Sequence, residues 1–437
     1  MADDWARAYV CAHFGKSLFW YMGEVFLTFF LIGMLDIDPV HISTYLALGL
    51  GLSAILDLAI GRLCQTWLHQ PRFAGRIQSI GALGCATSFG TILVSGYVTH
   101  APAGIVAGIL MFRIAFELYD VGQETLLSIV PTLDPGRRRG IVGLRLAGSA
   151  IASMLISVMT GYFATPGRNT GAALHLAAIA IAISTTAILT ALVLERRSTT
   201  HPPRGPSSPW SPPTAVAPTP QSPAHLRQAL SIQCVAIFVS AWTAPYFVRI
   251  FPFILHAAPA IPTWILACLP VGATISQPLW HRMIGRVGEA KGIVTGCAAS
   301  CAALAGMALL ADPPRHDDYA VLAVLIFLLG VANGGVALGL WTHFVETAAA
   351  ARHTSRYYGT FMAVSKVGLA AMSVLLGEQI GTDGRGPSLP VFCLTATCAL
   401  LAIGACALLL PRAATDRTIA QDTGPRDIAP HRTSGHL

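Results

Sequence analysis

Residues 111–131, MFRIAFELYDVGQETLLSIVP, carry four charged side chains within a stretch that is otherwise mostly apolar. These are Arg113, Glu117, Asp120 and Glu124. Their spacings of four, three and four residues put all of them on one face of an α-helix. Charged groups are costly in the lipid environment that such an apolar stretch suits. The segment therefore predicts a membrane helix whose charged face is turned away from lipid.

The composition of the whole chain is that of a membrane protein. Of its 437 residues, 54% are hydrophobic and 11% are charged, and the mean hydropathy is +0.61. A soluble domain carries about a quarter charged residues. Apolar runs of roughly 20 residues, long enough to cross a bilayer, recur along the chain. We expect twelve membrane spans, near residues 10–34, 40–62, 77–98, 103–131, 141–164, 171–194, 229–255, 261–284, 291–311, 319–346, 357–381 and 387–411.

The net charge of +7 comes from arginines that are concentrated in alternate loops. The basic loops hold Arg62, Arg72, Arg76, Arg137–Arg139, Arg196, Arg197, Arg282, Arg286, Lys291, Arg352 and Arg356. The intervening loops hold Arg168, Arg315 and Arg385. Basic loops face the cytoplasm, so this asymmetry predicts a multi-pass protein of the cell inner membrane with both termini cytoplasmic. The basic balance is a topology signal and does not indicate a nucleic-acid partner.

The predicted spans fall into two sets of six around a segment rich in proline and serine. We expect a six-helix bundle over 1–195, a flexible cytoplasmic linker over 196–228, a second bundle over 229–411, and a disordered tail over 412–437. Each half has a basic loop after its second span, GRLCQTWLHQPRFAGR (61–76) and HRMIGRVGEAKG (281–292). Matching loops predict two related halves, as in transporters that bind solute between repeats.

Five further ionisable residues lie inside predicted spans: Glu24, Asp57, Arg145, Arg249 and Lys366. With the stripe in 111–131 they make five acids and four bases, a set that nearly neutralises itself. One interpretation is structural, with Arg113 paired to Glu117 in a contact that holds helices together. Buried ion pairs rarely add net stability, and intramembrane charges more often mark substrate or ion pathways. Lys366 is notable because the chain has 3 lysines against 25 arginines, and a buried lysine can change its protonation state.

Several stretches resemble the glycoside–pentoside–hexuronide:cation symporters, the melibiose-permease-like branch of the major facilitator superfamily. They are FGKSLFW (14–20), ILDLAIGR (55–62), YDVGQETLLSIVPTLDPGRRR (119–139), GLRLAGS (143–149) and SRYYGTFMAVSKVG (355–368). The resemblance covers most of the first half and, in the second half, the surroundings of Lys366. It implies an all-α membrane protein with the 12-helix major facilitator fold, its two six-helix halves related by pseudo-symmetry.

The resemblance also implies roles for individual residues. Asp57 matches a cation-ligand aspartate, and Asp120 matches an aspartate shared between the sugar and cation sites. Arg145 matches a sugar-contacting arginine, and Lys366 matches the lysine of the eleventh helix. We expect substrate contacts from Asp120, Arg145, Lys366, Glu124, Ser17 and Glu24, cation coupling from Asp57, Glu117, Asp120 and Ser53, and gating from Arg113 and Arg249.

Four positions depart from the family pattern. Ser17 stands where the family has a sugar-binding aspartate, and Glu124 stands where a tryptophan stacks on the sugar ring. Ser53 replaces a second acid of the cation site, whereas Glu117 replaces a threonine there. Two carboxylates thus remain near the cation position, while much of the sugar-binding chemistry is lost. These exchanges favour a charged or zwitterionic polar solute.

We therefore expect a secondary active transporter that couples a cation, H⁺ or Na⁺, to symport of a small polar solute, either charged or glycosidic, by alternating access. Its partners are the solute, the coupling cation and the lipid bilayer, and we expect a monomer without any other cofactor. The alternative on the same fold is proton-driven efflux of a metabolite or drug. A membrane-embedded enzyme would need a catalytic cluster at a membrane face, and the sequence shows no such motif.

The arginine asymmetry generates a topology test. In a variant without reactive native cysteines, a single cysteine introduced by Trp210→Cys is expected to react with a membrane-impermeant maleimide only after the membrane is permeabilised, because the linker is cytoplasmic. Labelling of intact cells from the periplasmic side would contradict the predicted orientation.

Overall fold

The computed structural model describes residues 2–27, 39–99, 101–130, 135–164, 172–199, 223–245, 264–310, 316–351, 353–383 and 389–410. All regular structure in these ranges is helical, which confirms the all-α prediction. The first half contains α1 (Ala2–Tyr21), a π-helical turn η1 (Met22–Phe26), α3 (Pro39–Leu63), α4 (Gln65–Leu68), α5 (Pro71–Tyr97), α6 (Pro102–Ile129), α7 (Pro135–Ala164) and α8 (Ala172–Thr199). The second contains α9 (Pro223–Pro245), α11 (Trp264–Val287), α12 (Glu289–Ala308), the 3₁₀ turn η4 (His316–Asp318), α13 (Tyr319–Ala350), α14 (Thr354–Asp383) and α15 (Leu389–Leu409).

Each of the twelve predicted spans overlaps one long helix. Helices α5 and α7 begin at Pro71 and Pro135, several residues before the predicted starts, because polar and basic turns continue the helix beyond the apolar run. Proline suits the first helical turn, where its missing N–H would have no partner. Seven of the described helices are long and apolar enough to cross a membrane by length and composition alone. Helix α6 is not among them, since it carries the four charges of the 111–131 stripe.

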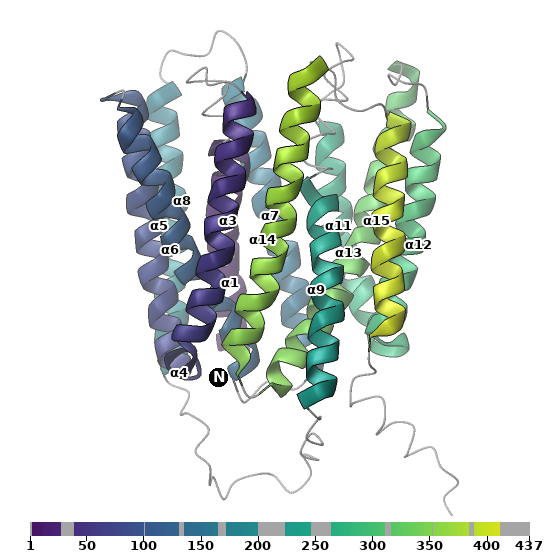
Figure 1. Ribbon diagram of the computed structural model, residues 1–437, viewed down its shortest axis with the longest axis horizontal. Helices are drawn as coiled ribbons and strands as arrows, with labels where there is room; N and C mark the ends of the chain where they lie inside the picture. Colours follow the sequence, from purple (N-terminus) through teal and green to yellow (C-terminus); the bar gives the residue numbers. More distant parts are fainter. Residues whose placement is uncertain are drawn as a thin grey trace, which may run out of the picture.

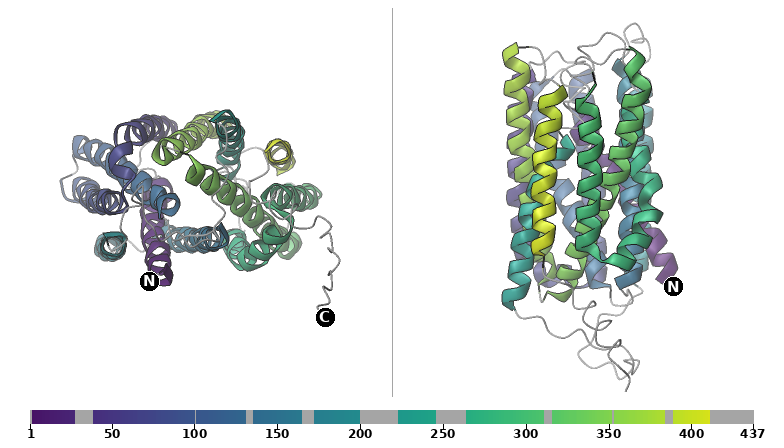
Figure 2. Two further views of the ribbon diagram at one scale, coloured as in Figure 1. Left: turned by 90° about the horizontal axis from the view of Figure 1, so that it is seen from below. Right: turned by 90° about the vertical axis from the view of Figure 1, so that its right-hand side faces the viewer.

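The helices run roughly parallel and form two groups, α1–α8 on one side and α9–α15 on the other (Figure 1). Seen along the helix axes, α14 lies beside α3, and α11 lies beside α7 (Figure 2). These contacts join the two halves. The axes of α3 and α14 therefore bring residues near 57 and near 366, far apart in sequence, to one level of the bundle.

Glycines allow α3 and α14 to approach closely. A Cβ atom on Gly359 would lie 2.4 Å from the backbone oxygen of Asp57, and one on Gly61 would lie 2.7 Å from the backbone oxygen of Ser355. The Ser355 hydroxyl donates a hydrogen bond to the Gly61 carbonyl at 3.1 Å. Small residues are the usual means by which membrane helices pack backbone to backbone.

The two halves also meet at the end of the bundle that carries the arginine-rich loops, which we call the basic end. There Arg138 of α7 pairs with Glu346 of α13 at 3.2 Å, and Arg139 pairs with Glu289 of α12 at 3.0 Å. Slightly deeper, the hydroxyls of Ser128 and Tyr358 are 2.9 Å apart. The two halves are therefore in contact at the basic end.

The close packing of α3 on α14 can be tested by one substitution at two positions of α3. Gly61→Val places atoms where the α14 backbone lies and is expected to destabilise the protein by about 1–3 kcal/mol through overpacking. Gly51→Val is the matched control, because a Cβ there meets no atom within 4 Å. Thermal unfolding of the purified variants should show a lower Tm for Gly61→Val than for Gly51→Val. Equal Tm values would contradict the close contact.

Candidate functional site

The charged stripe of α6 lies in the interior of the protein, as the sequence predicts. The four side chains, Arg113, Glu117, Asp120 and Glu124, are each at most 2% exposed. Each forms an ion pair with a residue of another helix. The stripe therefore joins helices of the bundle through charge.

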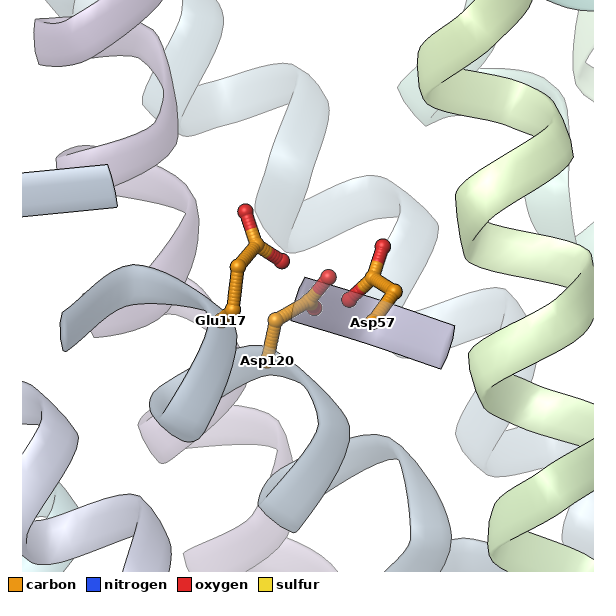
Figure 3. A group of neighbouring side chains, drawn as sticks. All are labelled: Asp57, Glu117 and Asp120. Carbon is orange, nitrogen blue, oxygen red and sulfur yellow. The ribbon is translucent and has the colours of Figure 1, made fainter. Parts of the chain in front are cut away.

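One group of contacts is centred on the ammonium of Lys366 in α14. Its Nζ lies 2.7 Å from Asp57 Oδ2 and 3.6 Å from Asp120 Oδ2, and it donates a short hydrogen bond to Glu117 Oε2. Figure 3 shows the three carboxylates of α3 and α6 converging on one place. One oxygen from each lies within 4.8 Å of the others. A lysine of the second half thus closes a carboxylate site built by the first half.

Three oxygens at this site are buried and have no hydrogen-bond partner among the described residues. They are Asp57 Oδ1, Glu117 Oε1 and Ser53 Oγ. Ser53 lies one helical turn before Asp57, so both side chains share a face of α3. Leaving a buried polar atom unpaired costs about 1–3 kcal/mol, and more if it is charged. An oxygen-only donor set with vacant lone pairs suits a proton or a hard cation such as sodium.

A second group of contacts is centred on Lys16 of α1. Its Nζ donates to Asp120 Oδ1 at 2.6 Å and to Glu124 Oε1 at 2.5 Å. The other Glu124 oxygen accepts a short hydrogen bond from Arg145 of α7. The Arg145 guanidinium lies over the ring of Trp341 in α13, 4.2 Å from its centroid. Asp120 therefore belongs to both groups, with one oxygen directed at each lysine.

Together the two groups contain three bases and four acids, all buried in the described core. The bases are Lys16, Arg145 and Lys366, and the acids are Asp57, Glu117, Asp120 and Glu124. With every group ionised, this core carries one net negative charge. A low-dielectric interior strongly disfavours such an excess. The core thus has the charge for one additional bound cation or proton.

Three of the remaining predicted residues, Glu24, Arg113 and Ser17, lie around this core. The ion pair of Glu24 joins η1 to Arg113 of α6 at 2.6 Å, so Arg113 does not form the pair with Glu117 that a structural role would predict. A π-helical turn such as η1 often occurs at a functional position. The Ser17 hydroxyl lies 2.8 Å from the backbone oxygen of His13 and 2.7 Å from the Ser149 hydroxyl. Arg249 lies outside the described residues.

The sequence analysis missed Lys16, His13 and Trp341. A signal for Lys16 was present, because it lies in the predicted span 10–34 and is one of only three lysines. It adjoins Ser17, a position that departs from the family pattern. Trp341 could not be identified from the sequence, because its ring reaches the site from the second half through tertiary packing.

Two helical bundles that meet around a buried polar site are the arrangement found in many membrane transporters. A sequence profile described as "MFS/sugar transport protein" matches residues 8–382. The chain belongs to this family, and this confirms the family expected from the sequence motifs. It is a multi-pass membrane transporter and not an enzyme.

Solved structures of the same fold agree with the assignment. The major facilitator transporter FucP in the outward conformation is 12% identical, with a TM-score of 0.61 and coverage of 93% of this chain and 98% of that one. The human organic anion transporter MFSD10 is 11% identical, with a TM-score of 0.61 and coverage of 93% and 99%. A bacterial homologue of the iron transporter ferroportin is 11% identical, with a TM-score of 0.64 and coverage of 94% and 99%. No curated protein sequence matches the chain significantly.

The contacts of Lys366 predict that removing its charge lowers the stability of the protein, and that removing one carboxylate charge as well restores part of it. Lys366→Met leaves the Asp57 and Glu117 carboxylates without their cation and is expected to destabilise the protein by about 3–5 kcal/mol. Adding Glu117→Gln removes one of the uncompensated charges, so the double variant should recover much of the lost Tm. Thermal unfolding of the purified single and double variants measures both effects. A single variant as stable as the wild type, or a double variant no more stable than the single one, would contradict the ion pairing.

Proposed function

We propose that the protein is a cation-coupled symporter that carries a small polar, charge-bearing solute by alternating access. The observation that carries this proposal is the buried carboxylate site, with three unpaired oxygens and a lysine supplied by the opposite half. The coupling cation is a proton or Na⁺, bound by Asp57 and Glu117 with Asp120 and Ser53 beside them. Crowded carboxylates favour retention of a shared proton, and the same oxygens suit a hard metal cation.

Coupling follows from where the cation would bind. Without it, the described core carries one net negative charge, and Lys366 is held by carboxylates of the first half. A cation bound to Asp57 and Glu117 neutralises the core and weakens the hold of those carboxylates on Lys366. Because Lys366 belongs to the second half, this change loosens one connection between the halves. The loaded core is then neutral when the halves rock about the site.

The solute site would lie on the Lys16 side of Asp120. Lys16 and Arg145 both pair with Glu124 there, so a solute must offer groups that replace these ion pairs. Sugars without charge offer hydroxyls alone, whereas a charged or zwitterionic solute offers both hydrogen bonds and charge. Trp341 supplies an aromatic face at the same place. It is an aromatic partner from the second half, at a site where Glu124 has replaced the family's tryptophan.

A neighbouring structure supports the type of transport proposed. The E. coli fucose:proton symporter shares the fold at a TM-score of 0.57 and 11% identity, with coverage of 94% of this chain and 98% of that one. A fold that carries proton-coupled sugar symport in that protein is compatible with cation-coupled symport here. We further propose that the basic end faces the cytoplasm, because Lys and Arg accumulate on the cytoplasmic side of membrane proteins.

Coupling can be tested in proteoliposomes with a solute selected by thermal-shift screening of the purified protein. The wild type should accumulate that solute against its gradient when a proton or Na⁺ gradient is imposed. Asp57→Asn and Glu117→Gln should each abolish accumulation, while Asp57→Asn still exchanges solute downhill, because the solute site remains. Glu195→Gln, outside the buried core, is the matched control and should transport normally. Accumulation by both core variants would refute the coupling role of these residues.

A further inference from the structure

A buried histidine beside the Lys16 group takes part in a continuous hydrogen-bond chain. His13 of α1 contacts Gln123 Oε1 through Nδ1 at 3.2 Å and Ser149 Oγ through Nε2 at 3.1 Å. Gln123 donates from Nε2 to Gln78 Oε1 at 3.2 Å. Gln78 then donates from Nε2 to the backbone oxygen of Ala191 at 3.0 Å. The chain connects α1, α5, α6, α7 and α8.

The backbone oxygen at the far end of this chain fixes the direction of its hydrogen bonds. A carbonyl can only accept, so Gln78 must turn its amide nitrogen toward Ala191 and its oxygen toward Gln123. Gln123 must then donate to Gln78 and present its own oxygen to His13. The His13 Nδ1 atom therefore carries a hydrogen. A neutral His13 in this arrangement has the Nδ1–H tautomer, with Nε2 free to accept from the Ser149 hydroxyl.

On the other side of the ring, the hydroxyls can point in either of two directions. With neutral His13, Ser17 donates to Ser149 and Ser149 donates to Nε2. With protonated His13, Nε2–H donates to Ser149, Ser149 donates to Ser17, and Ser17 donates to the His13 backbone oxygen, 2.8 Å away. Each ring nitrogen has a suitable partner in both states. Protonation thus needs only two hydroxyl rotations and leaves both ring nitrogens and both serine hydroxyls with a hydrogen-bond partner.

The charged groups around His13 have opposite effects on its protonation, since the acids favour the charged ring and the bases disfavour it. The titratable side chains that face it are Tyr9 and Lys16 of α1, Asp120 and Glu124 of α6, and Arg145 of α7. Glu124 Oε1 lies 3.7 Å from Nδ1 and favours the charged ring. While Lys16 and Arg145 hold Glu124, their positive charges cancel that attraction. A change that removes Lys16 from Glu124 would leave this carboxylate to stabilise a histidinium.

The second half also contains a contact between a glutamine and a histidine, Gln233 and His343. Gln233 of α9 lies 220 positions after His13, and His343 of α13 lies 220 positions after Gln123. Gln233 Nε2 is 2.6 Å from His343 Nδ1 and donates to Thr347 at 2.9 Å. The first and fourth helices of each half thus share a histidine–glutamine contact with the two residues exchanged. In the described structure, the pair of the first half is the one placed beside the ionic core.

We propose that His13 is a proton-binding residue of the transport site, neutral while Lys16 holds Glu124 and protonated on Nε2 when solute draws Lys16 away. The proton comes from a hydronium ion of the aqueous phase: its O–H bond breaks, the Nε2–H bond forms, and a water molecule is left. A histidinium would then supply, beside Glu124, the positive charge that Lys16 has given to the solute. Its role in transport rests on the proposed function, but its test uses ligand-free protein, so that the failure of either is distinguishable.

The test is ¹⁵N NMR of the purified full-length protein, labelled in its histidine rings, over a pH series. His13→Gln identifies the His13 signals by their loss. Near neutral pH the wild type should show neutral His13 with hydrogen on Nδ1, and the protonated form should appear at the acidic end of the series, where the variants are compared. In Lys16→Met the ratio of protonated to neutral His13 at a given pH should rise on the order of tenfold, because a nearby buried cation is removed. Lys16→Arg keeps the charge and is the matched control, with a ratio close to that of the wild type.

A second pair of variants tests the protonation of His13 independently, in case Lys16→Met does not fold. Glu124→Gln removes the counter-ion, and Ser149→Ala removes the acceptor of Nε2–H. Each should lower the protonated fraction at a given pH. The proposal is overturned if neutral His13 carries its hydrogen on Nε2 instead. It is also overturned if the protonated fraction is the same in the wild type and in the variants that fold.

Discussion

The absence of water from the interior of a bilayer is the constraint on which this structure depends. An ionised side chain there must be neutralised by protein, because lipid offers it no partner. Asp120 links the two groups of ion pairs, since its two carboxylate oxygens face Lys16 and Lys366 at 2.6 and 3.6 Å. Through it, charges of α1, α3, α6, α7 and α14 form one connected network. A change in the charge or position of one side chain alters the electrostatic energy of the others. A transporter that couples two solutes needs this property.

Much of the fold and part of the site followed from the sequence. The twelve apolar runs, separated by loops that are alternately rich and poor in arginine, located every long helix of the described residues. The spacing of Arg113, Glu117, Asp120 and Glu124 showed that one face of α6 is interior, because helical periodicity is a local property. Asp57, Asp120, Arg145 and Lys366 were identified by their resemblance to family motifs. The structure places all four in the two connected groups of contacts.

Pairings across helices could not be predicted in the same way. Arg113 and Glu117 have the spacing of a helical ion pair, yet Arg113 pairs with Glu24 and Glu117 pairs with Lys366. Partners of this kind depend on how α6 is rotated against α1 and α14, which tertiary packing decides. Lys16 was overlooked because it lies beside a position where the family pattern is broken. Lys16 pairs with Glu124 at 2.5 Å, so the two positions have to be considered together.

The glycine contact between α3 and α14 has a mechanical consequence. Gly359 rests against the backbone of Asp57, and Lys366 stands seven residues further along the same helix, about 10 Å away at 1.5 Å per residue. If α14 tilts by about 15° with Gly359 as the fulcrum, the backbone at Lys366 moves by roughly 2–3 Å over that lever arm. Such a displacement is comparable to the 2.7 Å separation of the Lys366 and Asp57 atoms. A small rotation between halves that stay in touch at their glycines is thus enough to open or close the ion pair.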